Sequence, residues 1–171
     1  MPGREPTTIP SSIEAMRASL LRLEGEWETV QASRNRDAIY GYLTAVFELV
    51  SWWATDGRAV ARAGRALHLR GHHSDREPEP FAALILCTAD RDQVDDRTRS
   101  KWSRVLRYAA EFKDPDEPLG DFIRRKGGIN RCASRLSRQR RLGKQYQGAQ
   151  PNEIACKPPI LLTHFWFRQN N

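Results

Sequence analysis

Basic side chains are concentrated in one stretch of this chain, LGDFIRRKGGINRCASRLSRQRRL (119–142), which also contains two adjacent glycines. Between Leu119 and Tyr146 there are nine lysines or arginines and a single acid, Asp121, which gives a net charge of 9 − 1 = +8. The whole chain of 171 residues carries +7, so the remainder carries 7 − 8 = −1. Such local basicity favours a surface that binds an anionic partner.

The glycine pair does not fit a phosphate-binding loop. Such loops follow G-x-x-x-x-G-K-[ST], or G-x-G-x-x-G after a strand. Here Gly127 and Gly128 are adjacent, and Leu119, Phe122 and Ile123 before them have the spacing of a helix. The sequence therefore predicts that Gly127 ends a helix, since glycine adopts the left-handed backbone conformation most easily.

A second amphipathic helix follows the glycines, because apolar or small residues recur at i, i+3, i+4 and i+7 from Ile129 to Leu136. Two such helices joined by a glycine turn have the sequence form of a helix-turn-helix. Arginine suits guanine edges or phosphate, asparagine suits adenine, and serine suits phosphate oxygens. Arg131, Arg135 and Arg138 are expected to contact DNA. Four further residues are expected mainly to hold phosphates: Arg124, Arg125, Lys126 and Arg141. The predicted DNA-binding residues are Arg124, Arg125, Lys126, Asn130, Arg131, Ser134, Arg135, Arg138 and Arg141.

The run GGINRCASRL resembles the GGN…AA..L run of Fis-type helix-turn-helix proteins over about ten of the 171 residues. In that family the glycines precede the first helix of the pair, which implies that SRQRRLGK begins the recognition helix. Ser137 stands where that family has a glycine. Two registers therefore remain: NRCASRLSRQRR is itself the recognition helix, or it is the element before it.

Other partners suit the same basic face. A basic amphipathic helix also binds acidic proteins or anionic membranes, and on many proteins it is simply a solvated surface. The alternative to DNA binding is thus an adaptor whose basic face meets an acidic protein, with no role in nucleic-acid binding.

Histidines form the best candidate for a metal site. His68 and His72 are spaced i, i+4, with His73 and Asp75 close by. Gly71 separates the first two, however, and the glutamate of H-E-x-x-H is missing, so an exposed loop is the better interpretation.

Acids cluster in DRDQVDD, before a helical pattern, where carboxylates more often cap a helix than hold Mg²⁺. These acids are Asp90, Asp92, Asp95 and Asp96. No catalytic arrangement can be inferred, so we expect no metal, no cofactor and no enzymatic activity.

The first predicted helix has the apolar spacing of a coiled-coil seam over about two and a half heptads. This seam suits a homodimer through residues 13–30 and equally an intramolecular hairpin with the next helix. Its members are Ile13, Met16, Leu20, Leu23, Trp27 and Val30.

The second helix, predicted over 37–54, is apolar around nearly its whole circumference, as expected of a central helix. Its apolar stretch of 17 residues contains Glu48 and falls short of the usual membrane span of about 20 residues. We therefore expect a buried core helix and no membrane span.

The complete pattern predicts an all-α protein, a compact bundle of about six or seven helices. Its parts are a flexible N-terminus (1–10), one helical domain (11–141, with the basic pair at 119–141) and an extended tail (142–171). FAALILCTA (81–89) suits a helix or a buried strand. Three widely spaced cysteines without a C-x-x-C, and a start lacking an apolar signal core, favour the cytoplasm. The sequence thus predicts a small cytoplasmic, non-enzymatic DNA-binding protein.

Overall fold

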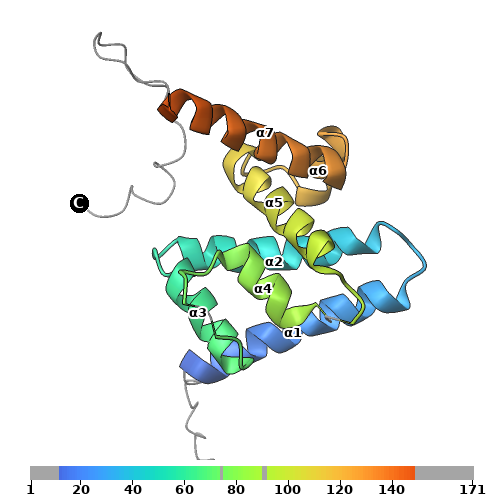
Figure 1. Cartoon of the computed structure of the whole chain (residues 1–171). Helices are drawn as coiled ribbons and strands as arrows, with labels where there is room; N and C mark the ends of the chain where they lie inside the picture. The colour runs from blue at the N-terminus through green and yellow to red at the C-terminus, as the bar shows by residue number, and fades with distance from the viewer. Residues whose placement is uncertain (1–11, 74, 90–91, 149–171) are drawn as a thin grey trace, which may run out of the picture.

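The computed structural model describes residues 12–73, 75–89 and 92–148, and within these ranges it consists of seven α-helices and no strand (Figure 1). The predicted all-α bundle is confirmed, and the short apolar run near residue 85 is a helix. The helices are α1 (Ser12–Ala32), α2 (Ala38–Ala54), α3 (Ala59–Leu69), α4 (Pro80–Thr88), α5 (Asp96–Phe112), α6 (Leu119–Arg125) and α7 (Ile129–Gly148).

The α2 helix is the centre of the bundle, as predicted, because it contacts α1, α3, α4, α5 and α6. Tyr42, Leu43 and Val46 are fully buried on it, and Val50 and Trp53 are almost so. In the described part of the chain, no helix is both long and apolar enough to cross a membrane.

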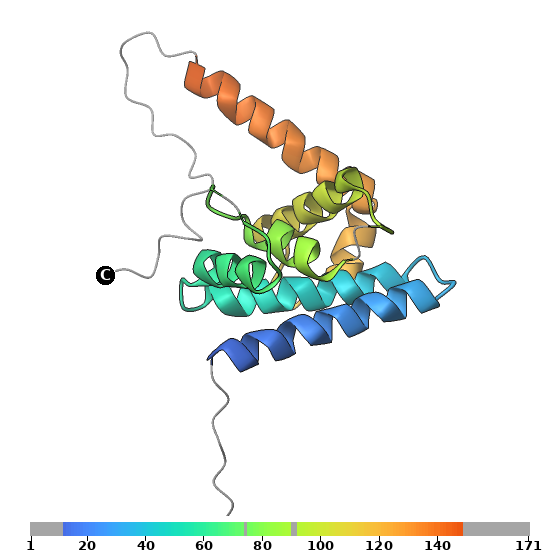
Figure 2. The ribbon, with the colours of Figure 1, turned by 60° about the horizontal axis from the view of Figure 1, so that its bottom comes forward.

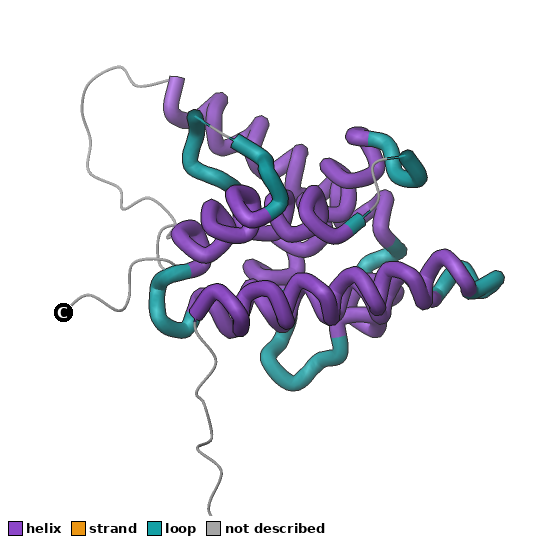
Figure 3. Tube along the Cα trace, turned by 90° about the horizontal axis from the view of Figure 1, so that it is seen from below, coloured by secondary structure: helices purple, strands orange, loops and turns teal. Residues whose placement is uncertain are grey.

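The α1 helix forms a hairpin with α2 (Figures 2 and 3). Four members of the predicted seam, Met16, Leu20, Leu23 and Trp27, are buried within the chain against α2 and α4. Ile13, at the start of the seam, is 46% exposed. The seam therefore serves the intramolecular hairpin.

Aromatic and polar contacts tie α1, α2, α4 and α5 together. The rings of Trp27, Tyr42 and Trp102 form a cluster with centroid distances of 5.4, 5.7 and 6.2 Å. The Tyr42 hydroxyl lies 2.8 Å from Thr88 Oγ1, whose own hydrogen goes to the Leu84 carbonyl at 2.8 Å. Tyr42 is therefore the donor to Thr88, and both buried hydroxyl groups are hydrogen-bonded.

The α7 helix runs past Arg141 to Gly148, so the predicted start of an extended tail at residue 142 is wrong for 142–148. Gly143 alone does not end the helix, and the first proline after α7 is Pro151. The far half of α7 projects beyond the other helices (Figures 1 and 2). The predicted flexible N-terminus, 1–10, and the rest of the predicted tail, 149–171, lie outside the described residues.

Candidate nucleic-acid interface

The turn between α6 and α7 is a helix stop, as the sequence predicts. Gly127 and Gly128 have φ angles of 91° and 89°, where a side chain would strain the backbone. The Gly127 N–H donates to the Arg124 carbonyl at 2.9 Å, and the Gly128 N–H donates to the Ile123 carbonyl at 2.8 Å. This pair of bonds is a Schellman motif. Both amides are used in closing α6, so neither is free to bind a phosphate.

The first half of α7 packs against α5 through small and apolar side chains. Cys132, Ala133 and Leu136 are buried there, and burial raises the pKa of the Cys132 thiol. Arg104 of α5 donates to the Ser137 hydroxyl at 3.0 Å. Because this face of α7 is held against α5, the opposite face points to solvent.

The solvent face of α7 carries arginines at i, i+4, i+7 and i+10. Arg131, Arg135, Arg138 and Arg141 are all exposed, and none forms a hydrogen bond or ion pair with another described residue. They extend over roughly 15 Å of helix axis, at 1.5 Å per residue. The whole of α7 contains six basic residues and no acid, so this face carries uncompensated positive charge.

Two polar residues of the predicted set lie near these arginines. Asn130 and Ser134 are exposed, and the Ser134 hydroxyl donates to the Asn130 carbonyl at 2.8 Å. That bond uses the only hydrogen of the hydroxyl, but its oxygen lone pairs and the Asn130 amide remain available.

Arg124 has a different environment from the arginines of α7. Its guanidinium lies 3.1 Å from a carboxylate oxygen of Asp37 and 3.1 Å from one of Asp121, and it stacks 4.8 Å from the Tyr40 ring centroid. The hydrogen bond to Asp37 is the main cause of its raised pKa. Arg124 therefore links α6 to the start of α2.

Arg125 is likewise engaged within the chain. It forms two parallel hydrogen bonds, 2.7 and 2.6 Å long, with the Glu117 carboxylate, and these lower the pKa of Glu117. Lys126 is half-buried, with its ammonium 5.7 Å from the Phe122 ring centroid. The predicted set thus divides into a free group on α7 and an internally bonded group on α6. Local sequence does not reveal this division, because Asp37 is far from Arg124 along the chain.

The α7 helix has no internal turn of the kind that the predicted Fis-type register requires. The Fis-type register needs a second turn near Ser137, whereas α7 is continuous from Ile129 to Gly148. NRCASRLSRQRR therefore lies within the second helix of the pair α6–α7.

The histidine and aspartate candidates can be compared only where the structure describes them. No group of three or more metal-binding side chains occurs among the described residues, although the rings of His68 and His73 approach to 5.9 Å. Asp95 caps α5 by accepting from the Thr98 N–H at 2.6 Å, as its position before the helix predicts. Asp90 lies outside the described residues.

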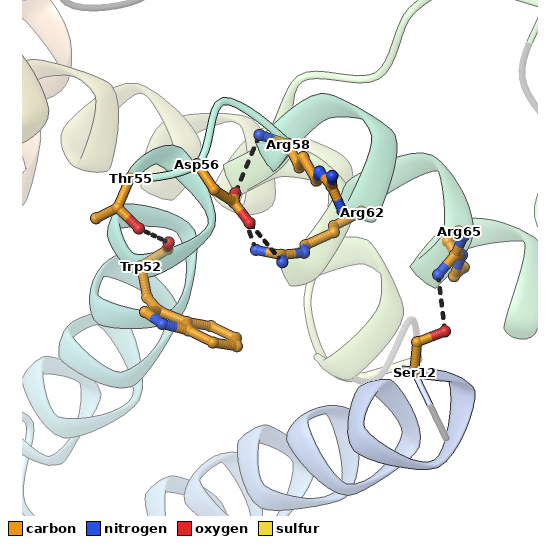
Figure 4. A network of polar contacts seen from close by, with 7 residues as sticks. All are labelled: Ser12, Trp52, Thr55, Asp56, Arg58, Arg62 and Arg65. Atoms are coloured by element: carbon orange, nitrogen blue, oxygen red, sulfur yellow. Dashed lines mark hydrogen bonds and ion pairs between the residues drawn. The ribbon is translucent and has the colours of Figure 1, made fainter. Parts of the chain in front are cut away.

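A second cluster of arginines, on α3, was not predicted as a site. Arg58, Arg62 and Arg65 are spaced i, i+4, i+7, which places them on one face of the helix, beside the exposed Trp52 of α2 (Figure 4). The regular spacing is visible in the sequence, but the neighbouring tryptophan comes from another helix. Only the tertiary structure shows that Trp52 and the three arginines line one cavity.

No protein-family model matches this sequence, and neither the comparison with curated proteins nor the one with solved structures gives a match.

Proposed function

We propose that this chain is a cytoplasmic, non-catalytic DNA-binding protein whose contact surface is the exposed face of α7. The observation that supports this most directly is the row formed by Arg131, Arg135, Arg138 and Arg141, none of which has an acidic partner among the described residues. A guanidinium without a partner can bind a phosphate without first breaking an ion pair. Its planar fork also matches phosphate or a guanine edge bidentately.

The shape of α7 is compatible with this role. The row of arginines spans roughly 15 Å, comparable to the major groove, which is about 12 Å wide. The far half of α7 projects from the bundle (Figure 2), and in the first half the exposed arginines lie away from the buried side chains that pack on α5. Asn130 and Ser134, near the start of the helix, add groups that suit adenine and phosphate.

The internal contacts of α6 assign a different role to its basic residues. Arg124 and Arg125 would have to leave Asp37, Asp121 or Glu117 to hold a phosphate. In this proposal they position the turn, and α7 supplies most of the binding charge. Lys126, which has no carboxylate partner among the described residues, is the member of this group best placed to hold a phosphate.

Self-association through residues 13–30 would have to use positions that the hairpin leaves exposed. Ile13 and Leu21 are 46% and 63% exposed, whereas most of the seam is buried. A homodimer of this kind would present two copies of α7. Sedimentation of Leu21→Glu against the unaltered chain tests it, and an unchanged monomeric mass for both would exclude it.

The test of DNA binding is a gel shift with duplex and single-stranded DNA. Arg131, Arg135 and Arg138 are replaced together by alanine, which favours helix and leaves the buried face intact. The matched control replaces Arg17, Arg22 and Arg36, which are exposed in and beyond α1 and also remove three charges. We expect the α7 variant to lose at least about tenfold in duplex affinity, and the control to lose far less.

Equal losses in the two variants would contradict a localised DNA surface. Duplex binding by the unaltered chain that is weak even at 50 mM salt, and no weaker in the α7 variant, would favour an acidic protein as the partner.

A further inference from the structure

A cavity of about 230 Å³ lies between the start of α1, the end of α2 and α3 (Figure 4). Its polar lining comes from Ser12, Ser19, Arg58, Arg62 and Arg65, and Trp52 borders it. No aspartate or glutamate is among the described residues that line it. The α7 helix packs mainly against α5 and α6, which contribute nothing to this lining, so the cavity is separate from the proposed DNA surface.

One of the three arginines holds the tryptophan in place. Arg62 donates to both carboxylate oxygens of Asp56, at 2.7 and 3.2 Å, and its guanidinium carbon lies 5.1 Å from the Trp52 ring centroid. Trp52 is nevertheless 60% exposed. Arg62 and Asp56 therefore position an indole that remains available to a ligand.

The other two arginines have no carboxylate partner among the described residues. Arg65 donates to the Ser12 hydroxyl at 3.3 Å, and the side chain of Arg58 makes no hydrogen bond or ion pair there. Three arginines and the one carboxylate of Asp56 leave a charge of 3 − 1 = +2 around the cavity. This charge is complementary to a dianion.

We propose that the cavity binds a phosphate monoester whose organic part carries a planar ring, such as a nucleoside monophosphate. The phosphate binds between Arg58 and Arg65, because guanidinium groups form charge-assisted bonds with phosphate oxygens. The ring lies against Trp52, since aromatic side chains stack on nucleobases. The volume is below the roughly 300–1,000 Å³ of typical ligand pockets, so part of the ligand stays in solvent.

The test is calorimetric titration of the full chain with three probes: AMP, ribose 5-phosphate, which lacks the ring, and adenosine, which lacks the phosphate. We expect AMP to bind at least about tenfold more tightly than either of the others. Arg58→Ala with Arg65→Ala should weaken AMP by at least about tenfold. Trp52→Leu should weaken AMP by about fivefold or more and leave ribose 5-phosphate unchanged.

Controls distinguish this cavity from other basic surfaces. Arg17→Ala with Arg22→Ala removes the same charge from α1 residues that do not line the cavity, and should leave AMP affinity unchanged. The triple α7 variant should also leave it unchanged, so the two proposals can fail separately. A 5′-phosphorylated trinucleotide, titrated into the triple α7 variant so that the proposed DNA surface does not contribute, separates two sources of the ligand, because tighter binding than AMP would indicate a strand end.

Two results would overturn the proposal. The first is no heat of binding with AMP at millimolar concentration. The second is an AMP affinity that does not change in the Arg58→Ala, Arg65→Ala variant while circular dichroism shows that variant to be folded.

Discussion

Gly127→Ala should destabilise the protein, because the turn between α6 and α7 requires a positive φ. A non-glycine residue in such a conformation costs about 1–3 kcal/mol, and alanine offsets about 0.4–1 kcal/mol by restricting the unfolded chain. The added Cβ would also lie 2.4 Å from Arg131 Cδ, so this side chain must move. We expect a net loss of roughly 1–2 kcal/mol, or a Tm lower by about 2–8 °C.

The same substitution at Gly25 should have the opposite sign. Gly25 lies inside α1, with an ordinary helical backbone and nothing within 4 Å of the place that an added Cβ would occupy. Alanine is favoured over glycine in a helix by about 0.5–1 kcal/mol, which should raise Tm by about 1–4 °C. Thermal unfolding followed by circular dichroism compares the two variants. A Gly127→Ala protein as stable as the unaltered chain would refute the reasoning on the turn.

Further predictions concern internal bonds. Tyr42→Phe should lower the free energy of unfolding by about 1 kcal/mol in urea titrations, because Thr88 loses its donor. Burial raises the pKa of Tyr42 above its ordinary value of 10.0. The stability that the buried neutral hydroxyl contributes is therefore complete below pH 10 and is lost as the pH rises further. A free energy of unfolding that stays flat through alkaline pH would contradict this. The pKa of Glu117 is lowered by its bond to Arg125, so the stability that this pair contributes is lost as the pH falls and the carboxylate is protonated. Glu117→Gln should therefore lower Tm at neutral pH and remove this part of the dependence of Tm on acid pH. That dependence should also vanish in Arg125→Ala.

Helix periodicity is what made the fold predictable. Apolar spacing indicates the buried faces of α1, α2, α6 and α7. On α5 the same i, i+3, i+4, i+7 spacing is that of the buried residues Trp102, Val105, Leu106 and Ala109. The short α4 remained ambiguous between helix and strand, because a brief apolar run fits both. The far end of α7 was missed because the stretch after Arg141 contains Gly143 and Gly148, which disfavour a helix, and only Leu142 and Tyr146 have apolar helical spacing.

The candidate sites were only partly predictable for a related reason. The sequence predicts that Arg135 and Arg138 are exposed, because the apolar residues of the same helix mark the opposite face as the buried one. The pairing of Arg124 with Asp37, and the contact of Arg62 with Trp52, depend on contacts between helices that local sequence does not encode.

The salt dependence of duplex binding, measured by fluorescence anisotropy, tests the central claim about α7 most directly. Each phosphate bound contributes about 0.9 to the slope of log K against log salt, so four bound arginines give a slope of about −3.6. Raising salt from 50 to 200 mM should then weaken binding by roughly 150-fold. The variant lacking Arg131, Arg135 and Arg138 should retain a slope of about −0.9 and weaken only about 3.5-fold. An unchanged slope in that variant would contradict the claim that the exposed arginines of α7 hold the DNA.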